Sequence, residues 1–265
     1  MAKYLAVFKV GLLNAFAYRF TIVFFLVMHF LALAVIFFLW LAIFNSPGQA
    51  EIAGYSLASI VTYYLGASIV RQAIASHFEY QMASEILRGK LSIYLLKPFS
   101  YLFCQMIRSW TWQLLSLILS LALYLAAIIL LRDYIIVPSL VQAALFLLAL
   151  IPGAIIYALV SAIFGTLTFW LLDPNNLFGL KETIIVFLSG FLLPLAFFPP
   201  VLQDVFFYLP FRYLISFPVE IFLGRLSGTA IWQGFLVELA WIPLLAIFLS
   251  WFWQKGVRHY EAVGS

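Results

Sequence analysis

The feature that most constrains this chain is the shortage of charge along its long apolar stretches. Only 9% of its 265 residues are charged and 66% are hydrophobic, whereas average soluble domains carry about 25% charged residues. A soluble chain of this size would need a polar surface to cover its core, and too few charged side chains are present to make one. The composition therefore predicts an all-α membrane protein, with lipid as the solvent for much of its surface.

Six stretches qualify as membrane spans, because a helix needs about 20 residues to cross a bilayer core of about 30 Å. They are Phe20–Phe44, Gly54–Val70 (closed by Arg71), Trp110–Leu131, Pro138–Leu172, Thr183–Phe198 and Ile231–Trp253. The fifth is marginal in length. Splitting the fourth at Pro152 would leave a first piece of about 14 residues, too short to cross, so we predict one long helix kinked at Pro152. We expect a single transmembrane domain over residues 1–265.

The distribution of basic residues predicts the orientation, since cytoplasmic loops are enriched in Lys and Arg. With the N-terminus inside, only Arg132, Arg212 and Arg225 of the 14 basic residues fall on the outer side. We therefore expect both termini to be cytoplasmic. The first apolar run is too long for the core of a cleaved signal peptide and is expected to stay in the membrane.

The segment before the first span mixes basic and apolar positions. Lys3 and Lys9 alternate with Tyr4, Phe8 and Leu12, a pattern typical of a helix lying in the inner membrane interface. We predict such an interfacial helix over residues 1–19. The alternative is that this segment simply extends the first span.

The largest cytoplasmic loop contains a candidate docking helix, within residues 77–98. Phe78, Met82 and Ile86 recur every four residues and share one helix face, while Glu85 and Arg88 add charge of both signs. Gly89 and Lys97–Pro98 are typical helix breaks. A short helix with apolar knobs and mixed charge is suited to docking on a soluble partner.

The outer segment 199–228 is hydrophobic but is cut by prolines into pieces too short to span. Irregular backbone at membrane depth survives only where protein or a water-filled cavity covers it. We therefore predict a re-entrant helical hairpin between the fifth and sixth spans, with Arg212 at the level of the interface.

Known catalytic patterns are missing from the sequence. The stretch Arg88–Ser92 lacks the upstream glycine of a P-loop and the Ser/Thr directly after its lysine, so ATP is not bound by that route. Ser56, in a Gly-x-Ser turn, has no histidine base predicted on its side of the membrane. His77 and Glu79 stand at i, i+2 and would not share a helix face. We predict no catalytic, metal or cofactor residue in this chain, and its net charge of +4 does not suggest nucleic acid.

Glu238 is the one acidic residue inside a predicted span. Ionisable groups there are costly and usually face a bundle interior, a cavity or a partner. Two interpretations stay open: a contact on a substrate path or gate, and a helix-packing hydrogen bond. His29, inside the first span, is interpreted as structural.

The chain resembles the permease subunits of ABC-2 type exporters, in particular a bacterial group of about this length. Three stretches carry the likeness: the cytoplasmic loop Ile86–Pro98, the outer segment Tyr208–Tyr213 continuing to Pro218 and Gly224, and the basic tail Trp253–Gly264. Their order, with six spans and cytoplasmic termini, extends the resemblance over essentially the whole chain.

The resemblance implies that two permease chains, identical or related, form a pathway between them in a bacterial inner membrane. Each would dock a separately encoded ABC ATPase, which holds ATP and Mg²⁺, through a coupling helix at about His77–Arg88. This gives Phe78, Met82, Glu85, Ile86 and Arg88 an ATPase-coupling role. The outer hairpin, with Pro210, Phe211 and Arg212, would help to close the external gate.

Two other classes of function stay open. An ion-coupled secondary transporter would need several acidic groups or paired broken helices near the midplane, and only Glu238 qualifies. A non-transporting membrane assembly factor is the third possibility. The transported substrate is not readable from the sequence.

Overall fold

A computed structural model describes residues 19–46, 51–98 and 100–260 of the chain. This part is helical, with one isolated bridge between Ile52 and Tyr55 as its β-structure. The predicted interfacial helix over residues 1–19 lies almost entirely outside it. The long helices are α2 (Arg19–Phe44), α3 (Leu57–Ile74), α6 (Tyr101–Leu130), α7 (Leu140–Thr166), α8 (Asn175–Leu188) and α11 (Thr229–His259). The short ones are α4 (Glu79–Leu87), α5 (Leu91–Leu95), η1 (Arg132–Tyr134), η2 (Leu167–Phe169), η3 (Leu195–Phe197), α9 (Pro200–Tyr208), η4 (Pro210–Leu214) and α10 (Ser216–Phe222).

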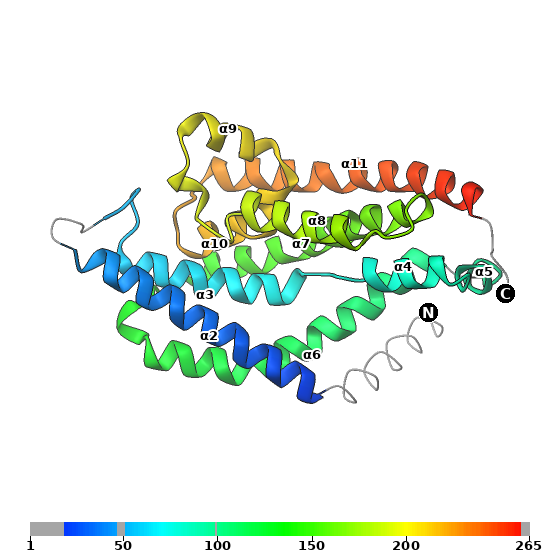
Figure 1. Cartoon of the computed structure of the whole chain (residues 1–265). Helices are drawn as coiled ribbons and strands as arrows, with labels where there is room; N and C mark the ends of the chain where they lie inside the picture. The colour runs from blue at the N-terminus through cyan, green and yellow to red at the C-terminus, as the bar shows by residue number, and fades with distance from the viewer. Residues whose placement is uncertain (1–18, 47–50, 99, 261–265) are drawn as a thin grey trace.

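Helix α7 is the centre of the bundle. It packs against α3, α4, α10 and α11, while α2 and α6 pack beside α3. Figure 1 shows α2 and α6 on one side of α3, and α8, α9 and α11 on the other. The short helices α4 and α5 and the end of α11 gather at one end of the long axis, which our orientation makes cytoplasmic; the 51–56 loop is at the opposite end.

Four helical stretches of the described chain are long and apolar enough to cross a membrane: Val27–Phe44, Leu57–Leu87, Leu140–Phe169 and Thr229–His259. Helix α6, with 30 residues, also has the length of a span. Helix α8 has only 14 residues, about 21 Å at 1.5 Å per residue, which is short of a bilayer core. The structure thus supports a multi-span membrane protein, and the count of six stays a proposal.

Local capping chemistry sets the helix ends, and it moves several predicted boundaries. Ser100 accepts a hydrogen bond from the Phe103 amide and starts α6 before the expected Trp110. Ser139 forms a capping box with Gln142 at the start of α7, which runs through Pro152 as one helix. Helix α8, in the region of the predicted fifth span, begins at Asn175 rather than Thr183. It ends before Gly190, whose φ of +84° turns the chain.

The outer segment folds into three short helices, α9, η4 and α10. Residues Ser216–Ile221 of α10 are buried, and α10 packs against α7 and α3. The amide of Ser216 donates to the carbonyl of Ser189 at 3.0 Å. Short helices broken by Pro210 and Ile215 are therefore covered by protein, which is the condition for irregular backbone at membrane depth.

The apolar surface is large and uneven. The Val27–Phe44 window of α2 is only 6% buried, whereas Leu57–Leu87 is 67% buried. Exposed apolar side chains also lie on other long helices, among them Ile118, Leu147 and Ile247. Exposed apolar area on this scale needs lipid or another hydrophobic chain to cover it.

The contact between α10 and α11 gives a test of this packing. Gly234 in α11 faces the ring of Phe217, and a Cβ at this position would overlap that ring. We predict that Gly234→Ala destabilises the fold by about 1–3 kcal/mol through overpacking and lowers the thermal midpoint in detergent. The control is Gly179→Ala in α8, where a Cβ meets open space and the higher helix propensity of alanine should raise the free energy of unfolding by about 0.5–1 kcal/mol. Equal thermal midpoints for Gly234→Ala and Gly179→Ala would contradict the packing of α10 on α11.

Candidate functional site

The densest group of charged side chains lies where α4 meets the membrane helices. Its members come from α3, the α3–α4 connection, α4, α7 and α8. We name it the polar cluster, and it consists of Arg71, His77, Glu79, Tyr157, Ser161, Lys181 and Glu182.

Lys181 is the centre of the cluster and is 1% exposed. Its Nζ lies 2.5 Å from Oε1 of Glu79, 2.9 Å from Oε1 of Glu182 and 3.2 Å from Oγ of Ser161. An ammonium group has three donors, and each of them has an acceptor here. Lys181 is thus a buried charge whose hydrogen bonds are complete, the condition under which burial of a charge is tolerated.

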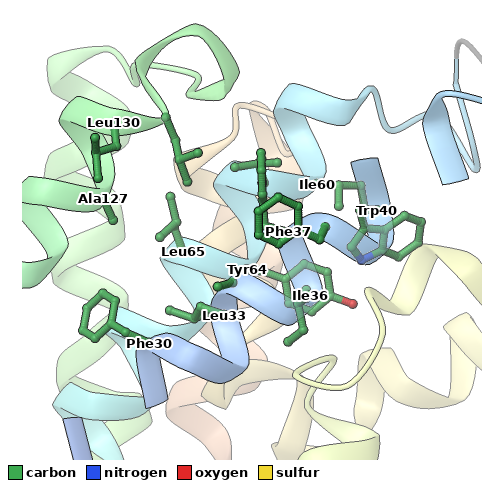
Figure 2. Close-up of a pocket in the computed structure, with 14 residues that line it drawn as sticks. Phe30, Leu33, Ile36, Phe37, Trp40, Ile60, Tyr64, Leu65, Ala127 and Leu130 are labelled. Carbon is green, nitrogen blue, oxygen red and sulfur yellow. The ribbon is translucent and has the colours of Figure 1, made fainter. Parts of the chain in front are cut away.

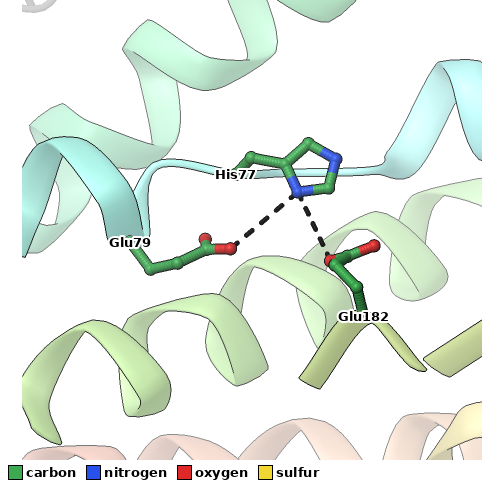
Figure 3. A group of neighbouring side chains, drawn as sticks. All are labelled: His77, Glu79 and Glu182. Atoms are coloured by element: carbon green, nitrogen blue, oxygen red, sulfur yellow. Dashed lines mark ion pairs between the residues drawn. The ribbon is translucent and has the colours of Figure 1, made fainter. Parts of the chain in front are cut away.

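Glu182 collects the remaining donors. Its carboxylate accepts from Arg71 at 3.2 Å and from the Tyr157 hydroxyl at 2.8 Å, and it lies 3.3 Å from Nδ1 of His77 (Figure 3). Burial alone would raise the pKa of the Glu182 carboxyl, but hydrogen bonds from His77 and the charge of Lys181 outweigh it and hold the pKa well below its ordinary value. Glu182 is therefore ionised at physiological pH.

Three members of the cluster carry metal-ligating atoms. Donor atoms of His77, Glu79 and Glu182 lie within 4.8 Å of one another. However, the Lys181 ammonium already contacts both carboxylates, and a divalent ion among them would be repelled by it. The arrangement is a charge-balanced network in which Arg71 and Lys181 hold two carboxylates. We call this network the lock, because it joins α4 to α3, α7 and α8.

Close backbone approach reinforces this lock. A Cβ on Gly165 of α7 would lie 2.8 Å from Sδ of Met82 and 3.4 Å from Cα of Glu79. Four residues earlier, Ser161 donates to the carbonyl of Ser76 at 2.6 Å. The small-residue pair Ser161 and Gly165 therefore lets α4 lie directly on α7.

The structure corrects the predicted orientation of α4. Phe78, Met82 and Ile86 are at most 5% exposed, and they pack with Ala158 and Ala162 in the interior. They are thus unable to contact a partner in this arrangement. A helix periodicity predicts which residues share a face but not what that face meets, and here it meets the chain's own α7.

Glu85 also faces inward. Its carboxylate accepts from the hydroxyl of Tyr101 at 2.7 Å and from Gln105 at 2.6 Å, and lies 3.4 Å from the guanidinium of Arg108. Glu85 therefore fastens α4 to the start of α6. Arg88, at the end of α4, is the predicted coupling residue that is exposed.

The predicted outer residues lie in η4. Pro210 is buried, and Phe211 and Arg212 are partly exposed. Arg212 pairs with Glu220 of α10 at 3.1 Å. This ion pair holds η4 and α10 together inside the outer segment.

Glu238 is 0% exposed, and among the residues that the structure describes neither of its carboxylate oxygens has a hydrogen-bond partner. Its Oε1 lies 3.6 Å from the position that a Cβ on Gly153 would occupy, and the carbonyl of Tyr213 lies 3.3 Å from the same point. Glu238 thus faces the junction of α7, η4 and α11. His29, by contrast, lies 3.4 Å from the Tyr124 hydroxyl, as a structural histidine would.

An apolar cavity of about 290 Å³ lies between α2, α3 and α6. Figure 2 shows Phe30, Phe37, Trp40 and Tyr64 around it. The lining has no charged side chain, so the cavity suits an apolar group and offers no group for catalysis.

Sequence reasoning missed Lys181, Glu182 and Tyr157. Lys181 counted only toward the inner charge bias, and Tyr157 was one aromatic residue in an uncharged run. The available signal was the pair Lys181–Glu182 next to a marginal span, since charges near a span need partners. Glu79, the partner of Lys181, is 102 residues away along the chain, a separation that no local pattern reports.

The polar cluster gives a second test. We predict that Lys181→Met destabilises the protein by about 3–5 kcal/mol, because Glu79 is left buried without its cation. Hydrogen exchange of the α4 amides should rise, and the double variant with Glu79→Gln should recover part of the loss. The control is Asp133→Asn, which removes the exposed pair Arg132–Asp133 and should change nothing measurable. Unchanged exchange in Lys181→Met would contradict the lock.

Comparison with known proteins gives one family. The sequence model of the family described as ABC-2 family transporter protein matches residues 30–264, which is most of the chain. No curated protein matches the sequence. The match spans the central helix α7, the polar cluster and the outer segment together, and the apolar helices agree with it. The chain belongs to the ABC-2 family of transporter proteins.

Proposed function

We propose that this chain is the transmembrane permease subunit of an ATP-driven ABC-2 type exporter, coupled to a separately encoded ATPase. Family membership supports a membrane permease of an ABC exporter. The observation that supports the coupling is the attachment of α4. Its buried face is held by contacts with α3, α6, α7 and α8, and its exposed face is open to a partner.

The exposed face of α4 consists of five residues, Tyr80, Gln81, Ser84, Leu87 and Arg88. Their spacing of i, i+1, i+4, i+7 and i+8 makes one stripe on the helix. Tyr80 and Leu87 are 45% and 44% exposed. Tyrosine and arginine are enriched at protein interfaces, so this stripe replaces Phe78, Met82 and Ile86 as the proposed ATPase contact.

A displacement of α4 would be passed on through its buried contacts. The pair Lys181–Glu79 links α4 to α8, and Glu85 links it to α6. Breaking a buried ion pair costs about 3–5 kcal/mol, so these contacts move together rather than slip. ATP and Mg²⁺ are expected on the ATPase, whose closure would push α4 and bias the spans from inward- to outward-open.

A second permease chain and lipid would cover the apolar surface. Helix α2 is the most exposed candidate span, which supports a role in contacts outside the chain. We propose six spans with cytoplasmic termini in a bacterial inner membrane, and an external gate formed in part by Pro210, Phe211 and Arg212. Burial of α10 against α3 and α7 supports the re-entrant form of that gate.

The junction around Glu238 supports a gating role over a packing role. A packing hydrogen bond would need a partner, and neither oxygen has one within the described part of the chain. The same single acid would serve an ion-coupled secondary transporter, the alternative function. A transporter of that class would work without an ATPase, and an assembly factor would not transport at all.

The coupling proposal is tested on the stripe of α4. We predict that Leu87→Asp combined with Arg88→Glu abolishes co-purification of a P-loop ATPase from native membranes, with the thermal midpoint unchanged because both side chains are exposed. Arg258→Glu is the matched control: it makes the same charge reversal at an exposed site near the end of α11 and should keep the ATPase. Undiminished co-purification by the double variant would contradict the assignment of α4.

Glu238 is tested separately. We predict that Glu238→Gln leaves the free energy of unfolding unchanged or raises it by about 1 kcal/mol, because a buried carboxylate without a partner is replaced by a neutral group of the same shape. The ATPase rate of the reconstituted complex should change several-fold, since the α7–η4–α11 junction loses its ionisable group. A variant with a lowered thermal midpoint and a normal ATPase rate would instead assign Glu238 to packing.

A further inference from the structure

A second cavity, of about 210 Å³, lies at the outer end of the molecule. We name it the outer cavity; its polar lining consists of Gln203, Arg212, Glu220 and Arg225. Its volume is below the range of about 300–1,000 Å³ that is usual for whole ligands. A site of this size accommodates one functional group of a larger molecule, or a small ion.

Arg225 is held in place without a carboxylate. Its Nη1 donates to the carbonyl of Gly54 at 2.6 Å, and its guanidinium lies 3.8 Å from the ring centroid of Tyr55. Within the described residues, no acidic side chain forms an ion pair with it. A guanidinium has five N–H donors, so most of those on Arg225 are available to a ligand while the cation stays oriented.

The remaining charges of the outer cavity neutralise each other. Glu220 accepts from Arg212 at 3.1 Å with one oxygen and from Ser216 at 3.0 Å with the other. Its negative charge is therefore engaged by Arg212. The cavity keeps one net positive charge, that of Arg225.

Arg212 lines the cavity beside Arg225. Its Nη2 donates to Glu220 at 3.1 Å, so this guanidinium adds a second cation that is already oriented by the protein. Two guanidiniums on one cavity are the donor set that binds phosphate and carboxylate oxygens.

The far wall is fixed by Gln203. Its Nε2 donates to the carbonyls of Ala196 and Phe198, at 3.2 Å and 2.7 Å. Both amide hydrogens of Gln203 are thus used within the protein. A net positive charge and the open donors of Arg225 make the cavity suited to an anion.

We propose that the outer cavity binds the phosphate group of a phosphate-bearing ligand, through Arg225 and Arg212. Two sources would present this chemistry at the outer surface: the headgroup of a phospholipid in the outer leaflet, and a soluble phosphate compound. The inference goes beyond the permease function, because phosphate binding at this cavity needs neither an ATPase nor transport.

The test uses the full chain purified in maltoside micelles, which contain no phosphate. One arm titrates inorganic phosphate and follows bound phosphate by ³¹P NMR. The other compares short-chain phosphatidylglycerol with short-chain diacylglycerol, which lacks the phosphate, by native mass spectrometry. We expect binding in at least one arm, and a loss of affinity of about ten-fold or more in Arg225→Gln, as the removal of a charge-assisted hydrogen bond predicts.

Arg132→Gln is the matched control, because Arg132 is another outer arginine, 81% exposed and paired with Asp133; its affinity should equal that of the wild type. Arg225→Lys keeps the charge but loses the planar fork, and its affinity should be intermediate. If Arg225→Gln aggregates on purification, the affinity of Arg225→Lys is compared with that of the wild type instead. Binding of inorganic phosphate identifies a soluble source, and binding of phosphatidylglycerol alone identifies the lipid. Binding in neither arm, or equal affinity in all variants, would overturn the proposal.

Discussion

Charge that is withdrawn from water must be paired, and in a chain with only 9% charged residues this constraint decides how the ends of the bundle are built. At the end of the bundle that holds α4 and α5, Lys181 is enclosed by Glu79, Glu182 and Ser161. At the outer end, Arg212 is paired with Glu220. Each pair joins a short helix to longer ones or to its neighbour, because the partners come from different elements. The apolar middle supplies burial, and the charged ends specify which helices lie together.

Glu238 is the exception to this rule. It is buried as completely as Lys181, but its carboxylate has no hydrogen-bond partner in the described part of the chain. The cost of leaving a buried polar group unpaired is about 1–3 kcal/mol, and such costs persist in native proteins mainly where another state of the molecule relieves them. Its position against Gly153 and the Tyr213 carbonyl is at the joint between the central helix and the outer segment. A movement of η4 would therefore change the surroundings of this carboxyl directly, together with the Arg212–Glu220 pair.

The existence of the long helices could be predicted from the sequence, since uncharged apolar runs of sufficient length have few alternatives. Their ends were less predictable. Hydropathy placed the third span at Trp110, whereas the Ser100 cap starts α6 nine residues earlier, within polar sequence that a hydropathy argument assigns to a loop. The fifth helix was misplaced for the same reason: Lys181 and Glu182 look like loop residues until their buried partners are known.

The direction in which α4 faces could not be predicted either. The apolar positions Phe78, Met82 and Ile86 were correctly grouped on one face, but an apolar face serves a partner protein and the chain's own core equally well. What decides between them is the close approach of α4 to the small residues Ser161 and Gly165 of α7, which lie far from α4 along the chain. The outer cavity shows the same limit. Arg225 and Arg212 entered the sequence analysis only through the count of basic residues on each side of the membrane. Their convergence on one cavity depends on the fold of α9, η4 and α10.

Helix α7 connects these features mechanically. Near one end of α7, Gly165 admits Met82 of α4; at the midpoint, Gly153 admits the Tyr213 carbonyl and Glu238. These two glycines are about 18 Å apart along the helix, at 1.5 Å per residue. Because α7 is one continuous helix between them, a displacement imposed on α4 reaches the outer segment without passing through a loop. A shift of α7 at its contact with α4 would therefore also change the contacts that Tyr213 and Glu238 make with Gly153 at the middle of the same helix.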